Sequence, residues 1–298
     1  MRKRWAVCAA LAAMALACNV QAQEVSGTLK KIRDSGAIML GLQTESVPFA
    51  YRDPDGKIIG YSVELCQRIA DGLKTQLGLA ALEVKSRPLV SAARVPLLTG
   101  NAVDLVCGSM SHTLEREAQV SFTYSHFFSR VRAVVRKDSA ARTLKDLAGE
   151  RVVLATGTTA VRLIHIYEKN NEVKFDKQYA GNFSQAFSAL QEGKAAAFVM
   201  DDILISGLIA QNRAQNSYRI LEESLHEEPY AIAMRRDPAF KQAVDGILAG
   251  LMKNGEVEKL YSRWFTSTIP PGLNLQVPAS AALLAAFANP TDKGVKEP

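Results

Sequence analysis

The chain has 298 residues, about two domains at the usual ~150 residues each, with 48% hydrophobic and 22% charged residues. This composition supports a large apolar core and excludes a disordered chain, a collagen-like repeat and a disulfide-dense miniature scaffold. The net charge of +6 falls to +3 without Arg2, Lys3 and Arg4, and the remaining charges alternate in sign. Because no basic block remains, we expect no nucleic-acid partner.

Residues 1–22 have the pattern of an export signal. A basic start at 1–4 precedes an apolar stretch at 5–17, and small residues at 20–22 suit a cleavage site. A membrane anchor would need a longer apolar run, and the residues before Cys18 make a poor lipidation motif. We therefore expect cleavage after Ala22 and, in a cell with two membranes, a periplasmic protein.

Short apolar strands alternate with amphipathic helices from residue 29 onward. In the first half the pattern predicts helices at 29–35, 61–77 and 91–98, strands at 37–42, 82–85 and 103–107, and a turn at 53–56. In the second half it predicts strands at 132–136, 151–155, 195–200 and 230–234, and helices at 143–149, 159–169, 184–192, 203–210, 238–253 and 256–264. This alternation is typical of βαβ units and parallel sheets.

Each half is an α/β unit of about a hundred residues, so the pattern predicts a two-lobed protein. We expect the chain to leave the first lobe near Ser129 and to return near Glu228. Lobe 1 would then comprise 23–129 and 229–270, and lobe 2 would comprise 130–228, with a surface strap at 271–298. Ligands of open α/β sheets bind beyond the carboxyl ends of strands, so the cleft between the lobes is the expected site.

A candidate anion cradle follows the strand at 103–107. Ser109 and Ser111 offer hydroxyl and backbone donors, and the guanidinium of Arg116 matches the two oxygens of a carboxylate. The alternative interpretation is an ordinary turn with a capping serine and a solvated arginine. On this motif alone the alternative is favoured.

Two more strands of the second half end in polar residues. Thr158 and Thr159 follow the strand at 151–155 at the start of a helix, where free N–H groups attract anions. Asp201 and Asp202 follow the strand at 195–200, where a carboxylate suits an ammonium group. Helix capping is the alternative for each motif, and it explains one aspartate as well as ligand binding does but two aspartates less well. Together, an anion cradle and a cation partner on facing strand ends predict a zwitterionic ligand, an α-amino acid.

The chain resembles the amino-acid-binding proteins of bacterial ABC importers (extracellular solute-binding proteins, family 3), and among them the glutamate/aspartate-binding group. The resemblance covers 27–271. It rests on residues 41–51, 60–62 with Glu64, 91–98, 107–109, 115–116, 157–159, 198–202 and 264–271. It implies an α/β fold of the two-lobed periplasmic binding protein type (type II), with mixed, mostly parallel sheets flanked by helices and two hinge crossovers.

The resemblance also implies roles at the backbone end of the ligand. The α-carboxylate would be held by Arg116, Ser111, Thr158 and Thr159. Asp201, with Ser109, would bind the α-ammonium group.

At the side-chain end the resemblance implies that Ser91 and Arg94 face an acidic side chain, and their spacing of three places both on one helical face. Phe49 would form a wall of the pocket. Two residues depart from the related proteins, which have Arg in place of Gln43 and His in place of Phe183. The ligand is therefore glutamate or aspartate bound with fewer contacts, or an amide relative such as glutamine or asparagine, for which Gln43 offers both a donor and an acceptor.

The resemblance further implies a monomer that delivers a small polar amino acid to an ABC permease in the inner membrane. No cofactor or metal is expected, because the histidines are scattered and no Cys/His spacing suggests ligation. Cys8 and Cys18 would leave with the signal. Related proteins have Cys where this chain has Ile232, so a disulfide either joins Cys66 to Cys107 or is absent.

Two other functions compete with this interpretation. One is a periplasmic enzyme on the same scaffold, similar to cyclohexadienyl dehydratase, because fold does not fix function. It would need a general acid in the cleft, and Glu45 is the only nearby candidate. The other is a sensor or lytic-enzyme module. Such a module needs a second domain or a later membrane span, and we expect neither from this sequence.

Overall fold

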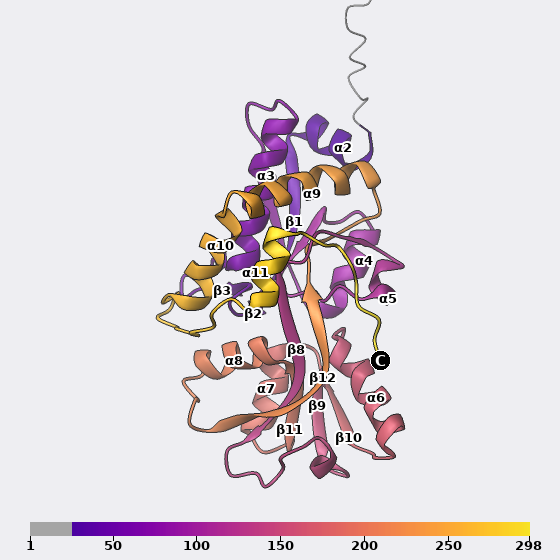
Figure 1. Cartoon of the computed structure of the whole chain (residues 1–298), viewed down its shortest axis with the longest axis vertical. Coiled ribbons are helices and arrows are strands. Elements are labelled where there is room, and N and C mark those ends of the chain that lie inside the picture. The colour runs from indigo at the N-terminus through magenta and orange to yellow at the C-terminus, as the bar shows by residue number, and fades with distance from the viewer. Residues whose placement is uncertain (1–25) are drawn as a thin grey trace, which may run out of the picture.

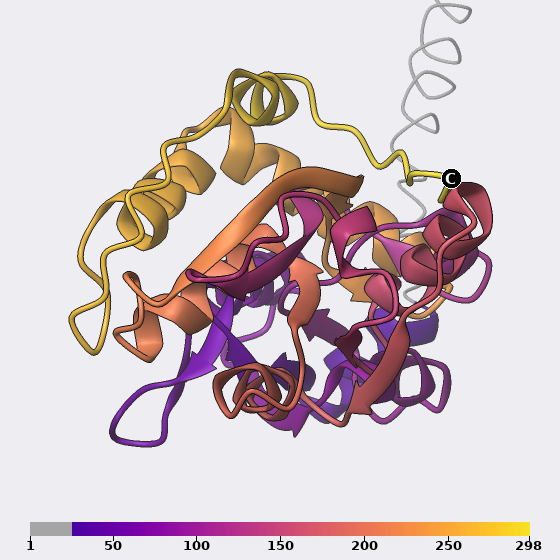
Figure 2. The same cartoon turned by 90° about the horizontal axis from the view of Figure 1, so that it is seen from below.

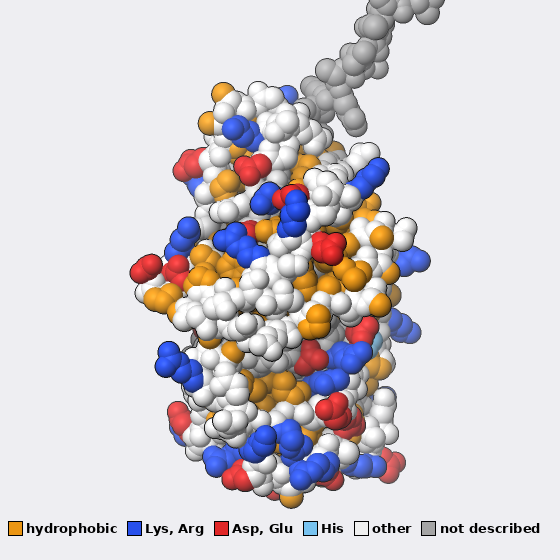
Figure 3. Space-filling model, turned by 60° about the vertical axis from the view of Figure 1, so that its left-hand side comes forward, with side chains coloured by type: hydrophobic (Ala, Val, Ile, Leu, Met, Phe, Trp, Pro, Cys, Tyr) orange, Lys and Arg blue, Asp and Glu red, His pale blue; other side chains and the backbone are white. Residues whose placement is uncertain are grey.

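The computed structural model describes residues 26–298, and the predicted export signal and its cleavage site lie outside the described residues. Two five-stranded sheets, each flanked by helices, form an upper and a lower lobe (Figure 1). Charged side chains of both signs are mixed over the face shown in Figure 3. Among residues 26–298, none of the helices combines the length and apolar character needed to cross a membrane.

The first sheet carries the strand that ends at the predicted anion cradle. Its order is β5 (Glu83–Leu89), β1 (Ala37–Gln43), β6 (Leu105–Cys107), β13 (Ala233–Met234) and β7 (Ser121–Phe122). β1 is parallel to β5 and β6, whereas β13 is antiparallel to β6 and β7. The helices of this lobe are α2 (Gly27–Ser35), α3 (Tyr61–Gln76), α4 (Arg94–Thr99), α5 (Leu114–Glu117), α9 (Pro238–Lys253) and α10 (Glu256–Tyr261).

The second sheet is built in the same way. Its order is β10 (Asp176–Ala180), β9 (Arg151–Ala155), β11 (Ala197–Asp201), β8 (Phe127–Arg136) and β12 (Tyr218–Tyr230). β9 is parallel to β10 and β11, and β8 is antiparallel to β11 and β12. Its helices are α6 (Thr159–Asn171), α7 (Phe183–Gln191) and α8 (Asp202–Gln211). Parallel strands therefore end together at the edge that faces the first lobe.

The long strands β8 and β12 lie side by side in the second sheet and extend from it to the first lobe (Figure 1). Their inner ends carry Phe127 and Tyr230, whose rings pack 5.0 Å and 5.2 Å from the ring of Phe49. Phe265 lies 5.4 Å from Phe49 and completes a buried aromatic cluster. This cluster supports the floor of the cleft from the side of the first lobe.

A small third sheet lies beside the cleft. It consists of β2 (Glu45–Ser46), β3 (Ala50–Arg52) and β4 (Ile58–Ile59), and the predicted turn at 53–56 connects β3 to β4. Asp53 fixes this turn, because its side chain accepts from the N–H groups of Asp55 and Lys57.

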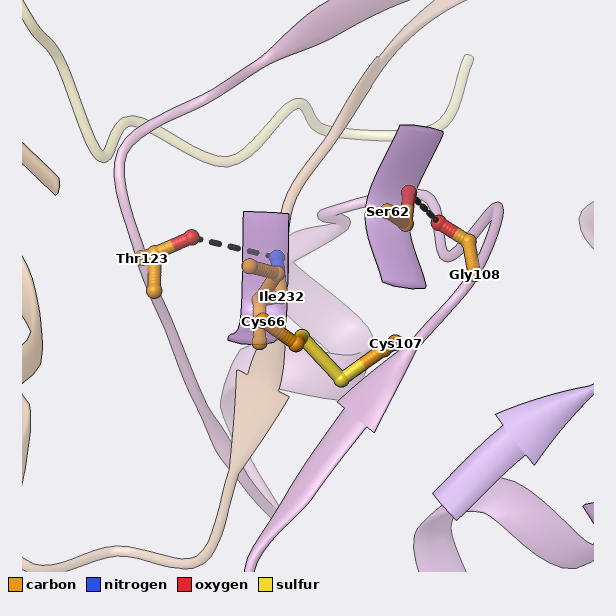
Figure 4. The surroundings of a disulfide bond; sticks show 6 residues. All are labelled: Ser62, Cys66, Cys107, Gly108, Thr123 and Ile232. Carbon is orange, nitrogen blue, oxygen red and sulfur yellow. Dashed lines mark hydrogen bonds between the residues drawn. A yellow bond between two sulfur atoms is a disulfide. The ribbon is translucent and has the colours of Figure 1, made fainter. Parts of the chain in front are cut away.

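Cys66 of α3 and Cys107 at the end of β6 form a disulfide with a Cα–Cα distance of 6.4 Å (Figure 4). Beside it, the hydroxyl of Ser62 donates to the carbonyl of Gly108 at 2.9 Å. Of the two alternatives that the sequence left open, the bonded one is found, and the disulfide fastens α3 to the end of β6, two residues before Ser109.

Most of the predicted elements are confirmed, and the differences are local. The strand predicted at 230–234 is in fact two strands, β12 and β13. β10 and most of β12 were missed, because their mixed polar residues hide the alternation of a strand. The helix predicted at 91–98 begins with a 3₁₀ turn at Ser91–Ala93. The helix predicted at 143–149 is only a 3₁₀ turn, at Lys145–Leu147.

The C-terminal tail contains a helix that the sequence analysis did not predict, α11 (Ala281–Ala288). It buries Leu283 and Phe287 in the hydrophobic core and contacts α9. The tail then runs along the outside of the molecule, and the C-terminus lies beside α5 and α6 (Figures 1 and 2).

Candidate functional site

Three strand ends meet where the two lobes face each other. Ser109 and Ser111 follow β6, Thr158 and Thr159 start α6 after β9, and Asp201 ends β11. All except Thr158 are less than a tenth exposed. The structure therefore brings the predicted anion cradle and the predicted cation partner to one buried region.

Arg94 lies at the centre of this region and is 3% exposed. It donates through Nε to the carbonyl of Ser91 (2.9 Å), through Nη1 to that of Ser109 (3.0 Å) and through Nη2 to that of Gly157 (2.9 Å). Burial, and then repulsion from Arg116, lower the pKa of Arg94 to about 9, so the side chain stays charged at neutral pH. Three of its five N–H donors are thus used by backbone carbonyls, and two are left.

Arg116 is held on α5, where Thr113 caps the helix by accepting from the N–H of Arg116. Its Nη1 donates to the carbonyl of Ser111 at 2.9 Å, and its Nη2 donates to that of Gly157 at 3.1 Å. Burial lowers the pKa of Arg116, opposed by the carboxylates of Glu228 and Asp201. The carbonyl of Gly157 therefore accepts from two arginines of the other lobe.

Glycine is required at position 157 by this close approach. Its φ of 77° is left-handed, and a Cβ there would lie 2.5 Å from the backbone of Ala92. A second contact between the lobes is similar, since a Cβ on Gly207 would lie 2.6 Å from the carbonyl oxygen of Val47. The lobes are thus in direct backbone contact, the closed arrangement of the cleft.

The acidic side of the site includes residues that the sequence analysis missed. Asp201 is 3% exposed, and its Oδ1 has no hydrogen-bond partner among the described residues. Burial, and then the charge of Glu228, raise the pKa of Asp201 to about 7. Tyr230 is fully buried beside it, and burial together with Asp201 raises the pKa of the phenol well above its usual value.

Glu228 is the main residue that was missed. It is 0% exposed. Its Oε2 accepts from the hydroxyl of Thr159 at 2.9 Å, and its Oε1 has no partner among residues 26–298. In the sequence it belongs to an acidic run with Glu222, Glu223 and Glu227 that resembles a solvated surface, so no local signal distinguished it.

The predicted side-chain end of the site is formed by uncharged groups together with Arg94. Gln43 accepts from the N–H of Ser109 at 2.9 Å and donates to the hydroxyl of Ser91 at 3.3 Å. Phe183 is 3% exposed and, with Gln43 and Ser91, lines a cavity of about 20 Å³. None of the described residues that line this cavity is Lys or Arg. Phe49 lies behind the site in the aromatic cluster, against Tyr230.

A larger cavity of about 360 Å³ opens at the other end. Its lining includes Arg94, Arg116, Thr158, Arg162 and Glu297. Arg162 of α6 forms ion pairs with Glu115 of α5 and, at 2.8 Å, with Glu297 of the tail. The tail thus joins the rim of the cleft next to the predicted carboxylate cradle.

Glu45, the candidate general acid of the enzyme interpretation, has a structural contact. Its carboxylate accepts from the N–H of Ser184 in the first turn of α7 at 3.2 Å. A carboxylate in this position stabilises the helix N-terminus and connects β2 to the second lobe.

Comparisons with known proteins agree with this geometry. Residues 38–267 match the model of the bacterial extracellular solute-binding proteins, family 3, and the chain belongs to this family. It is 36% identical over 291 residues to the L-glutamate/L-aspartate-binding protein of Pseudomonas aeruginosa, covering 97% of this chain and 96% of that protein. It is 32% identical over 293 residues to the glutamate/aspartate import solute-binding protein of Escherichia coli K12, with 96% and 97% covered. These relatives are transport proteins rather than enzymes.

Among solved structures, the fold matches an ancestral arginine-binding protein bound to arginine. The TM-score is 0.69 at 28% sequence identity, covering 77% of this chain and 98% of the other. The resemblance inferred from the sequence and the two-lobed amino-acid-binding fold are both confirmed.

Proposed function

We propose that this chain is the solute-binding component of an amino-acid ABC importer, and that it binds a polar amino acid between its lobes. The observation that carries the proposal is the pairing of opposite charges across the cleft, with Arg116 on the first lobe and Asp201 on the second. Asp201 is buried and Arg116 is half-buried, and once the cleft closes on a ligand an unpaired ligand charge there would be strongly unfavourable. A zwitterion would place a negative group against Arg116 and a positive group against Asp201.

In this proposal the α-carboxylate lies on Arg116, Ser111 and the start of α6 at Thr158 and Thr159. Free N–H groups and the helix dipole favour an anion at that helix terminus. The α-ammonium lies on Asp201 and Ser109. Gln43, Ser91, Arg94 and Phe183 surround the ligand's side chain, and Phe49 supports the pocket from behind.

The ligand class is that of the acidic amino acids and their amides. The named relatives bind or import glutamate and aspartate, which supports the acids. Gln43 and Phe183 supply no positive charge at the side-chain end, which supports the amides. Arg94 can donate to the side chain of an acid or of an amide through the two N–H groups that do not bond to backbone carbonyls.

Delivery would depend on a hinge motion about β8 and β12, near Ser129 and Glu228, with the cleft closed on the ligand. The closed monomer would then dock on a permease of the inner membrane. Export to the periplasm, after cleavage behind Ala22, suits the Cys66–Cys107 disulfide, because such bonds persist in oxidising compartments.

A thermal-shift screen of ligand-stripped protein against the twenty amino acids tests the proposal. A ligand at 100 times its Kd should stabilise the fold by about 2.7 kcal/mol, with glutamate, glutamine, aspartate or asparagine giving the largest shift. If no amino acid raises the melting temperature, the proposed function is wrong.

A further inference from the structure

Glu228 and Asp201 lie on one face of the second sheet, on either side of β8. Asp201 of β11 pairs with Val131 of β8, and Glu228 of β12 pairs with Ser129 of the same strand. Because alternate residues of a strand point to the same side, and paired residues share a face, both carboxylates project in one direction. That direction leads to the start of α6, where Thr159 donates to Glu228.

Glu228 faces the ligand region from within the protein. It is 0% exposed, and only one of its two oxygens is bonded to a described residue. Among the charges around Arg116, that of Glu228 acts on the guanidinium most strongly, and it is also the strongest charge acting on Asp201. Glu228 therefore lies within electrostatic reach of both groups that would hold the ligand's backbone charges.

Equal numbers of basic and acidic groups converge on the backbone end of the site. Arg94 and Arg116 contribute two guanidinium groups, and Asp201 and Glu228 contribute two carboxyl groups, of which Asp201 is ionised above about pH 7. The other carboxylates near the site have contacts of their own. Asp202 lies against Arg132, and Glu115 and Glu297 share Arg162. Glu45 accepts from the N–H of Ser184 at the start of α7.

The net charge of the occupied site depends on the charge of the ligand. A ligand that is neutral overall leaves the net charge of these groups unchanged, whereas a ligand with an acidic side chain adds one negative charge. In a region shielded from water, such an excess is unfavourable.

We propose that Glu228 is a specificity-determining residue, whose fixed negative charge disfavours ligands with an acidic side chain relative to their amides. The inference rests on the proposed function, because it assumes that an amino acid binds between Arg116 and Asp201. Thr159 holds the carboxylate in place. A purely structural role, in which Glu228 only anchors α6, would weaken all ligands alike.

The test compares dissociation constants of glutamate and glutamine, and of aspartate and asparagine, by calorimetry at pH 8, where Asp201 is ionised. Glu228→Gln keeps an oxygen for Thr159 but removes the charge, and should raise the acid-to-amide affinity ratio by roughly tenfold, the scale for a unit charge several ångströms away. Glu227→Gln is the matched control. Glu227 pairs with Arg130 in an exposed ion pair, so this change should leave the ratio unaltered.

A second variant avoids disturbing the hinge strand. Gln43→Arg cancels the excess negative charge from the side-chain end and should move the ratio in the same direction. The inference is overturned if Glu228→Gln folds and binds with an unchanged ratio, or, should that variant not fold, if Gln43→Arg leaves the ratio unchanged. If the unmodified chain binds no amino acid at all, the proposed function fails together with the inference.

Discussion

Arg116 of the first lobe donates a hydrogen bond to the carbonyl oxygen of Gly157 in the second lobe, at 3.1 Å. This bond connects a residue proposed to bind the ligand's carboxylate with the turn that starts α6. Closure of the cleft and formation of the carboxylate site are therefore coupled, since both depend on the approach of the same turn.

Gly157→Ala should hinder closure. The added Cβ would lie 2.5 Å from the backbone of Ala92, and the φ of 77° disfavours alanine. We expect a loss of at least tenfold in ligand affinity, measured by calorimetry, and a weaker ligand-induced compaction in small-angle scattering. Gly149→Ala is the control, because Gly149 has a φ of 81° but open space around its Cα. Equal losses of affinity in both variants would show that backbone strain, not the contact with Ala92, is responsible.

Arg116→Ala and Asp201→Asn should each abolish measurable binding. Each removes the partner of one ligand charge that the closed cleft shields from water, at a cost of about 3–5 kcal/mol. Arg130→Ala is a suitable comparison. The Arg130 side chain forms an exposed ion pair with Glu227, so this variant should bind the ligand with normal affinity. Retained affinity in Arg116→Ala would mean that the carboxylate is held elsewhere.

Binding should depend on pH through Asp201, whose pKa is about 7 in the protein. The groups that face it are Glu228 and Tyr230 of β12, the adjacent Asp202, and Arg94 and Arg116 of the other lobe. Below pH 7 Asp201 holds a proton that an ammonium group must displace. Affinity should thus rise with pH, by up to about tenfold per unit between pH 5 and 7, and level off above.

Calorimetry in buffers of different ionisation enthalpy provides the direct measurement of this coupling. At pH 6 binding should release most of one proton per molecule, and at pH 8 almost none. Proton release that is equal at the two pH values would assign the titration to another group.

The sequence predicted those parts of the fold that have strong local signals. Hydrophobic periodicity located α3, α9 and the buried strands β1 and β9, and polar residues after strand ends located Ser109, Thr159 and Asp201. Glu228 was not predictable, because its burial arises only when β12 pairs with β8 and meets α6. The same holds for β12 itself, whose exposed glutamates mask its buried face. The burial of Glu228 and the formation of β12 both depend on strand pairing between distant parts of the chain, not on local sequence preference.

The disulfide should contribute to stability without contributing to the chemistry of the site. Cys66 and Cys107 are 41 residues apart, and a cross-link of this size typically stabilises a protein by about 2–4 kcal/mol. A Cys66→Ser, Cys107→Ser double variant should lose this amount in urea unfolding at pH 7. Reducing agent should destabilise the unmodified protein similarly and leave the double variant unchanged. Destabilisation of the double variant by the same agent would contradict the assignment.

The C-terminal tail should slow the opening of the cleft. It is anchored to the first lobe by reciprocal backbone bonds between Val295 and residues 112 and 114, at 3.0 Å each, and by the pair of Asp292 with Lys241 at 2.9 Å. Its Glu297 is nearly buried and pairs with Arg162 of the second lobe. The tail thus links the two lobes beside α5 and α6, where the C-terminus lies (Figure 1).

Removal of residues 296–298 should therefore increase the rate of ligand release several-fold, measured by stopped-flow fluorescence, with little change in melting temperature. Glu297→Gln removes only the charge and should reproduce most of the effect, because it weakens the pair with Arg162. Lys296→Gln is the control on the neighbouring residue and should release ligand at the normal rate. A release rate unchanged by Glu297→Gln would show that the pair between Glu297 and Arg162 does not restrain the lobes.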